Sequence, residues 1–185
     1  MVATYDVVFV NGVSITETVI TNGRFRTDDA NTADLTNPCL IDSVKRRSYW
    51  KGFALKFGGT FSQISNIRIY SNGDINWPLG TTGKLKLGNR DTGDIGVPDA
   101  SYVQATGTPG VTGNDFETSH AHFSGQTTKS VNFNTIVSGS PKVVDSSNYT
   151  SAGRSKHAVL QLEVDTDATQ GLQAAKTATF LVDEI

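Results

Sequence analysis

The alternation of apolar and polar positions predicts short β-strands along most of the chain. In residues 157–164 apolar side chains take every second position from Ala158, and Gln161 and Glu163 lie between them. Because successive side chains of a strand point to opposite faces, this segment should have one face in the core and one in solvent. Residues 177–183 repeat the pattern, and we expect the two segments to pair as neighbouring antiparallel strands.

Other segments with strand-like patterns are bounded by turn-forming pairs such as Asn22-Gly23 and Gly58-Gly59. These segments are residues 5–10, 50–57, 65–70, 84–87 and 131–137. The one helical candidate is 172–178, rich in Ala, where we expect a turn or a single helical turn. The pattern predicts an all-β fold over residues 1–185, a single β-sandwich of jelly-roll or immunoglobulin-like topology with long irregular loops.

Two segments do not follow the strand pattern. Residues 88–130 contain seven glycines, two prolines and few apolar side chains, and only residues 101–105 resemble a strand. So long a loop is typical of a functional or partner-ordered segment, although a meander of short edge strands would have the same composition. Residues 1–45 are rich in Thr, Asn and Asp, and they form either part of the sandwich or an extended N-terminal arm packed on a neighbouring subunit.

Composition narrows the classes of partner. Charged residues make up 18% of the 185 positions and the formal net charge is −2, so no electrostatic attraction to nucleic acid or to an anionic membrane is expected. Cys39 is the only cysteine, which excludes an intrachain disulfide. Residues 1–23 contain no Lys or Arg, and no segment approaches the roughly 20 apolar residues of a membrane span, so we expect neither a secretory signal nor a bilayer anchor.

Two groups of residues could bind metal. His120 and His122 would lie on one face of a strand and supply two ligands, or they are exposed loop histidines. Asp91, Asp94 and Asp99 resemble an oxygen-rich Ca²⁺ loop, but their spacing does not match an EF-hand, and Asp also favours turns through its own hydrogen bonds.

Catalytic motifs are missing from the sequence. No G-x-S-x-G motif or nucleotide-binding glycine signature is present, and Cys39 lies beside apolar Leu40 in a context typical of an inert thiol. We therefore expect a protein that is not an enzyme and needs no cofactor.

Aromatic and basic residues raise two further hypotheses. Trp77, Tyr70 and Tyr102 could stack on sugar rings, although Trp77 could equally pack as a lid over the sandwich edge. The basic run at residues 45–47 is more typical of a solvated turn than of a phosphate site.

Four stretches resemble virion structural proteins of tailed bacterial and archaeal viruses. They are YVQATGTPGVTG at 102–113, AVLQLEV at 158–164, ATQG at 168–171 and TFLVDE at 179–184. The resemblance implies a non-enzymatic protein of the virion that decorates or cements a capsid or belongs to the tail. Its partners would be the major capsid protein or tail components and further copies of itself, with a trimer favoured. Two alternatives are a carbohydrate-binding module for host attachment and a cellular surface or filament subunit.

Overall fold

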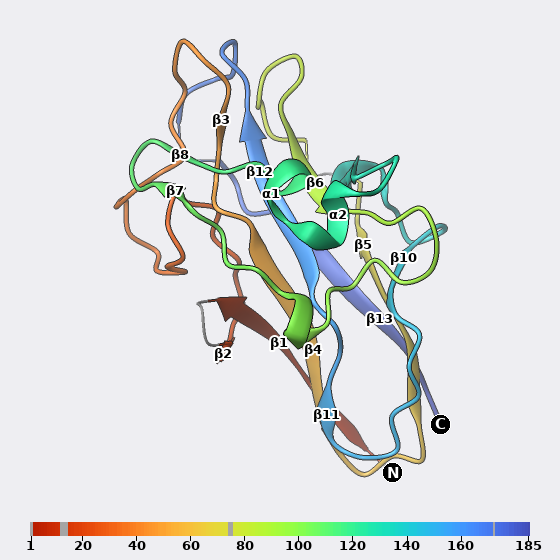
Figure 1. Cartoon of the computed structure of the whole chain (residues 1–185). Helices are drawn as coiled ribbons and strands as arrows, with labels where there is room; N and C mark the ends of the chain where they lie inside the picture. Colours follow the sequence, from red (N-terminus) through yellow and green to blue (C-terminus); the bar gives the residue numbers. More distant parts are fainter. Residues whose placement is uncertain (1, 12–14, 74–75, 172) are drawn as a thin grey trace.

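The chain folds into two antiparallel β-sheets packed face to face (Figure 1). The computed structural model describes residues 2–11, 15–73, 76–171 and 173–185. The larger sheet has the order β2 (Thr16–Val19), β1 (Ala3–Asn11), β4 (Lys51–Gly59), β12 (Ala158–Val164), β6 (Lys84–Gly88) and β9 (Ser130–Asn132), while β11 (Gly153–Arg154) pairs with β4 and β3 (Arg46–Arg47) with β12. The smaller sheet has the order β10 (Lys142–Asp145), β5 (Ile64–Ser71) and β13 (Ala178–Glu184). The predicted all-β class is confirmed.

The strands expected at residues 5–10, 50–57, 65–70 and 84–87 are confirmed as β1, β4, β5 and β6. Residues 157–164 and 177–183 also form strands, but their expected pairing is wrong. β12 lies between β4 and β6 in the larger sheet, whereas β13 pairs with β5 in the smaller one. The segment between them crosses from one sheet to the other, which local alternation cannot reveal.

Three local predictions are wrong. The strand expected at 131–137 ends at Asn132, whose side chain accepts a hydrogen bond from the Asn134 N–H and caps the short helix η2 (Phe133–Thr135). The strand expected at 101–105 is irregular after η1 (Asp99–Ser101). Residues 173–177 of the helical candidate are also irregular, while Leu172 lies outside the described residues.

The main core lies between the two sheets. Phe9, Phe53 and Leu160 of the larger sheet pack against Ile69 and Val144 of the smaller one. All five side chains are at most 8% exposed, so burial of apolar area provides the main stabilisation of the sandwich.

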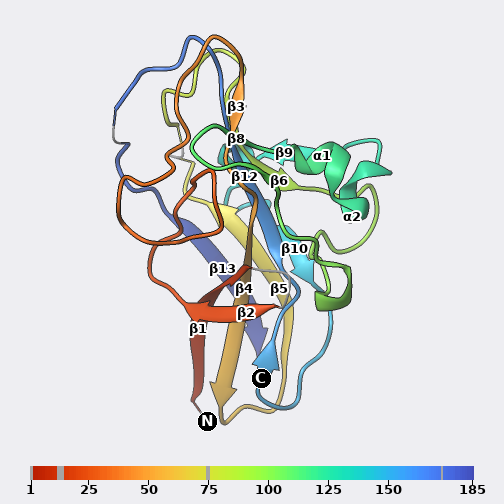
Figure 2. The ribbon, with the colours of Figure 1, turned by 60° about the vertical axis from the view of Figure 1, so that its left-hand side comes forward.

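A second core lies on the outer face of the larger sheet, beneath residues 89–130. Phe116 of α1 (Phe116–Ser119) and Phe123 of α2 (Ala121–Ser124) pack with Trp50 and Val159. A Cβ atom on Gly88 would lie 2.4 Å from the Phe123 ring, so only glycine allows this approach. Figure 2 shows α1 and α2 projecting beside β6 and β12. The segment is held by its own chain, and it includes a small hairpin of β7 (Gly107–Thr108) and β8 (Thr112–Gly113).

The covered face buries polar and charged side chains of the central strands. Gln161 is fully buried and Glu163 is 5% exposed, so the prediction that these residues face solvent is wrong. The Lys86 side chain is 1% exposed, and its Nζ lies 2.8 Å from Asp115 Oδ1 and 3.3 Å from Glu163 Oε2. Burial acts to raise the pKa of both carboxyl groups, but Lys86 and Arg47 outweigh it and lower them.

β1, β2 and the segment at residues 28–30 pack on the chain's own sheet. β1 lies between β2 and β4, and the Lys51 Nζ donates to the carbonyl oxygens of Asp28 at 2.5 Å and Ala30 at 3.1 Å. Burial lowers the pKa of Lys51 to about 8. Lys51 therefore anchors this irregular segment to the edge of the core.

Candidate functional site

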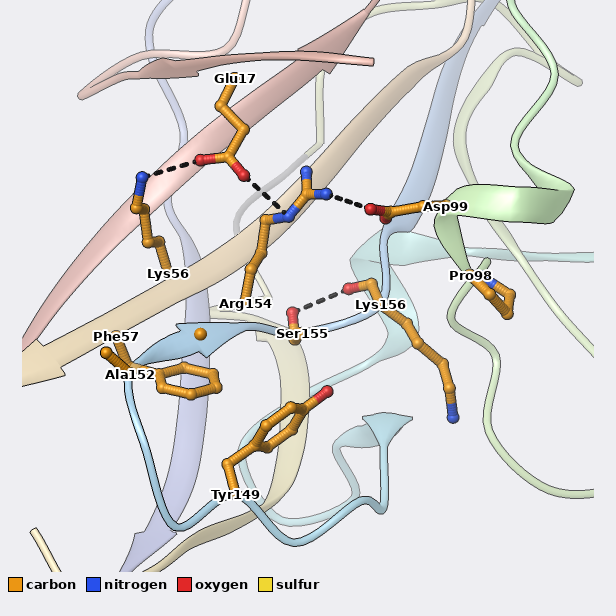
Figure 3. A pocket seen from close by; sticks show the side chains of 11 residues that line it. Glu17, Lys56, Phe57, Pro98, Asp99, Tyr149, Ala152, Arg154, Ser155 and Lys156 are labelled. Atoms are coloured by element: carbon orange, nitrogen blue, oxygen red, sulfur yellow. Dashed lines mark hydrogen bonds and ion pairs between the residues drawn. The ribbon is translucent and has the colours of Figure 1, made fainter. Parts of the chain in front are cut away.

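An open groove rich in charged side chains lies beside β11 and has a volume of about 590 Å³. Figure 3 shows Glu17, Arg154 and Asp99 in a row along one wall, with Phe57 and Tyr149 below them. The groove is lined by Glu17, Lys56, Phe57, Pro98, Asp99, Tyr149, Ala152, Gly153, Arg154, Ser155 and Lys156. Its walls come from strands far apart in the sequence and from η1, so only the folded sandwich assembles them.

Ion pairs run along the groove wall. Arg154 lies between two carboxylates, with its Nε 3.1 Å from Glu17 and its Nη2 2.6 Å from Asp99. Lys56 extends the row, its Nζ lying 2.9 Å from the second Glu17 oxygen. The Arg154 side chain is 12% exposed but that of Lys56 is 52% exposed, so Arg154 organises the wall and Lys56 faces solvent.

Asp99 also holds a buried histidine. The His157 Nε2 lies 2.6 Å from Asp99 Oδ1, and the His157 side chain is fully buried. Burial lowers the pKa of His157, and the contact with Asp99 acts in the opposite direction. The Tyr102 ring lies over His157 at 5.3 Å between centroids, and a Cβ on Gly52 would lie 3.0 Å from the Tyr102 ring. Glycine in β4 thus makes room for this pair of rings.

The far end of the groove is fixed by Lys156. Its Nζ lies 2.6 Å from Asp94 and 3.2 Å from Asp145, and the Tyr149 hydroxyl donates to Asp145 at 2.7 Å. Burial, followed by the contact with Asp145, raises the pKa of Tyr149. Tyr149 therefore stays a neutral donor at physiological pH.

The side chain of Ser155 in the groove makes structural hydrogen bonds. The Ser155 Oγ accepts a hydrogen bond from the Leu55 N–H at 3.0 Å and donates to the Lys156 carbonyl at 2.8 Å. With its side chain 2% exposed, Ser155 is not placed as a nucleophile.

The three candidate calcium ligands lie in different hydrogen-bond networks. Asp91 accepts from the main-chain N–H groups of Thr127 and Thr128, Asp94 binds Lys156, and Asp99 binds Arg154 and His157. Within the described ranges no group of three or more His, Cys, Asp or Glu side chains is arranged to hold a metal ion.

The two histidines lie at the junction of α1 and α2, not on a strand. His120 is fully buried against Trp50 and Phe123, so the expectation that both are exposed is wrong. Burial, followed by His122, lowers the pKa of His120 to about 4.

The three aromatic candidates for sugar stacking lie in two different clusters. Trp77 packs edge-on against Phe25 beside the inner core, and its indole N–H donates to the Ala174 carbonyl at 2.8 Å. Tyr70 packs against the same core, whereas Tyr102 belongs to the cluster on the outer face. Trp77 thus has the position of a lid over the sandwich edge.

The basic run and the cysteine have structural surroundings. Arg46 and Arg47 form β3, so the interpretation of this run as a solvated turn is wrong. Arg47 binds Glu163 and Asp115, and Lys45 lies 3.4 Å from Glu163. Burial raises the pKa of Cys39 to about 12, which keeps its thiol protonated.

Comparison with known proteins adds no relative. No protein-family model, no curated protein and no solved structure matches the chain. Among the helices in the described ranges, none has both the length and the apolar character needed to cross a membrane.

Sequence reasoning missed most of the groove. Glu17, Lys56 and Arg154 lie far apart in the sequence, and no local motif connects them. Asp99 was singled out, but as a calcium ligand and not as the partner of Arg154 and His157. The fold alone brings these groups together.

Proposed function

We propose that this chain is a non-enzymatic structural protein that acts through contacts with other proteins, in keeping with a role in decorating or cementing a virus capsid. The observation that supports this proposal is the groove, whose wall carries charges paired in a row with an exposed lysine at its rim. A shallow, charged surface of this kind suits an extended protein segment better than a small substrate.

The chemistry of the groove favours a partner segment that carries carboxylates. The ammonium groups of Lys56 and Lys156 lie toward opposite ends of the groove, and their side chains are 52% and 28% exposed. Phe57 and Tyr149 between them offer apolar area, with ring centroids 4.8 Å apart. Acidic groups at both ends of an extended segment, with an apolar group between them, would complement this arrangement.

The same contacts argue against hydrolytic chemistry. The proton of Ser155 is directed to a main-chain carbonyl, and His157 is fully buried with Asp99 and Tyr102 as its neighbours. The His157 Nε2 bonds to Asp99, and in the part of the chain that the structure describes its Nδ1 has no hydrogen-bond partner. Such a site lacks the nucleophile and base in contact that covalent catalysis requires.

The proposal is tested by asking whether the chain co-purifies with assembled virus particles. Particles purified by density gradient from cells that make the chain should carry it in a fixed ratio to the major capsid protein. Lys56→Glu should lower that ratio several-fold, because it places a negative charge beside the acidic segment. Lys129→Glu, which makes the same charge change within residues 89–130, is the control. A chain that stays wholly in the soluble fraction, or a Lys56→Glu protein that binds particles as well as the control, contradicts the proposal.

A further inference from the structure

β13 is an edge strand with one whole row of main-chain groups directed outward. β5 pairs with it on one side only. Ile185 and Gln63 exchange both main-chain hydrogen bonds at 2.9 Å, so Ile185 points toward β5, and by alternation Glu184 points away. At the other end, Ala178 lies opposite Ser71, whose N–H donates to the Ile136 carbonyl and not to β13. The outward residues are therefore Ala178, Phe180, Val182 and Glu184.

These outward groups have no main-chain partner in the described ranges, because none of the main-chain hydrogen bonds outside the strand ladders involves them. The irregularity in the ladder belongs to β5, where Asn66 has a φ of 49° and adds one residue, so β13 itself alternates regularly. β13 also contains no proline. It lacks two of the devices by which edge strands avoid pairing.

The sequence of this edge is complementary to itself in an antiparallel register. If Phe180 is placed opposite its own copy, Lys176 faces Glu184 and Ala178 faces Val182. Ile185, which is 71% exposed, then faces Ala175. Opposite charges and apolar pairs directly across an antiparallel ladder both stabilise it.

We propose that two copies of the chain pair through β13 across a two-fold axis at Phe180, which joins their smaller sheets into one continuous sheet. The outward hydrogen-bonding groups at positions 178, 180 and 182 of one copy meet those at 182, 180 and 178 of the other, and Glu184 lies opposite Lys176, which precedes β13. Such an interface uses the same surface on both copies and closes as a dimer. This dimer is an alternative to the trimer that the resemblance to virion proteins favours, and it is independent of the groove beside Arg154.

Charge selects this register over its neighbour. With Leu181 at the axis, Ala178 faces Glu184, so the Glu184 carboxylate meets no lysine. Only the register centred on Phe180 forms two Lys176 to Glu184 pairs, one at each end of the paired strands. These pairs hold the two strands in alignment, as charged side chains do in other paired elements.

The dimer is tested by sedimentation velocity of the full chain over a concentration series. The wild-type protein should show a monomer–dimer equilibrium. Lys176→Glu and Glu184→Lys should each raise the dissociation constant at least about tenfold, since each places like charges opposite one another at both ends. The double variant should restore dimerisation, because it exchanges the charges without changing the register. Lys129→Glu, which reverses a lysine charge away from β13, is the matched control.

A main-chain variant tests the strand pairing itself. Ala178→Pro removes an outward N–H that β5 does not use, so it should weaken the dimer while the circular dichroism spectrum and melting temperature of the monomer stay unchanged. A wild-type monomer at every concentration, a trimer, or a double variant that stays as monomeric as the single ones overturns the proposal.

Discussion

The outer faces of the two sheets differ in what covers them. On the larger sheet, residues 89–130 cover the central strands and bury Lys86, Gln161 and Glu163. On the smaller sheet, Leu181 is 37% exposed and the ion pair between Arg68 and Asp183 lies at the surface. The comparison shows that a segment with few apolar residues can cover the face of a sheet. It does so when two aromatic side chains pack on that face and every buried charge has a partner.

The largest expected effect comes from removing an aromatic anchor of the covered face. Phe123→Ala should lower the free energy of unfolding by about 3–5 kcal/mol, because it leaves a cavity above Gly88. Leu181→Ala on the bare face should change it by less than about 0.5 kcal/mol. Urea denaturation of both variants measures the difference, and equal effects would show that residues 89–130 add little to stability.

Breaking the buried ion pairs should have the next largest effect. Lys86→Met leaves Asp115 and Glu163 with Arg47 as their main cation and should destabilise the fold by about 3 kcal/mol. Arg68→Met breaks the surface pair with Asp183 and should have an effect of about 1 kcal/mol or less. Thermal melts at pH 7 compare the two variants. An Arg68→Met protein that is destabilised more than the Lys86→Met protein would show that the buried ion pairs do not stabilise the fold.

The covered face should also dominate the response to acid. In an unfolded chain the histidine pKa is about 6.5, whereas that of His120 in the folded state is about 4. Between these values only the unfolded state binds the proton, so stability falls as the pH decreases, and His120 should account for about 2 kcal/mol between pH 7 and pH 5.

His120→Phe, which removes this titration, should flatten that part of the profile of unfolding free energy against pH. Asp115 and Glu163, whose folded pKa values are lowered, add stability above the pH at which they titrate in the unfolded chain and lose it as the pH falls further. An identical slope above pH 5 in the variant would show that His120 is not the group responsible.

The smallest effect concerns the free edge of β13. At concentrations where the protein is monomeric, the amide hydrogens of Phe180 and Val182 should exchange faster than those of Thr179 and Leu181 by a factor on the order of ten, because only the latter are directed at β5. In β12 both edges are paired, and no such alternation is expected. Amide exchange measured by NMR at two protein concentrations compares β13 with its outer edge free in the monomer and with that edge paired in the dimer.

Local alternation predicted the strands but not what covers them. In β12 it located the inner face correctly, because Ala158 and Leu160 are buried there. It assigned Gln161 and Glu163 to solvent, because the segment that covers them is distant in sequence and poor in apolar residues. The polarity of a residue on a strand does not indicate whether its charge will be neutralised by a residue distant in the sequence, as Lys86 does for Glu163.

Neither the pairing of the strands nor the groove could be predicted from local sequence patterns, and the reason is the same for both. β12 and β13 are successive strands, but each finds its partners elsewhere, because burying an apolar face of both requires two layers and not one. The groove depends on Glu17 meeting Arg154, which follows only from the pairing of β2 with β1 and of β1 and β11 with β4.

The central position of β12 has a consequence for synthesis of the chain. β4 and β6 each pair with β12, so the larger sheet cannot close until the ribosome has released residues 158–164. Until then a nascent chain exposes two unpaired strand edges, and such intermediates are prone to aggregate. Demand for chaperones should therefore be greatest while the segment between β6 and β12 is translated.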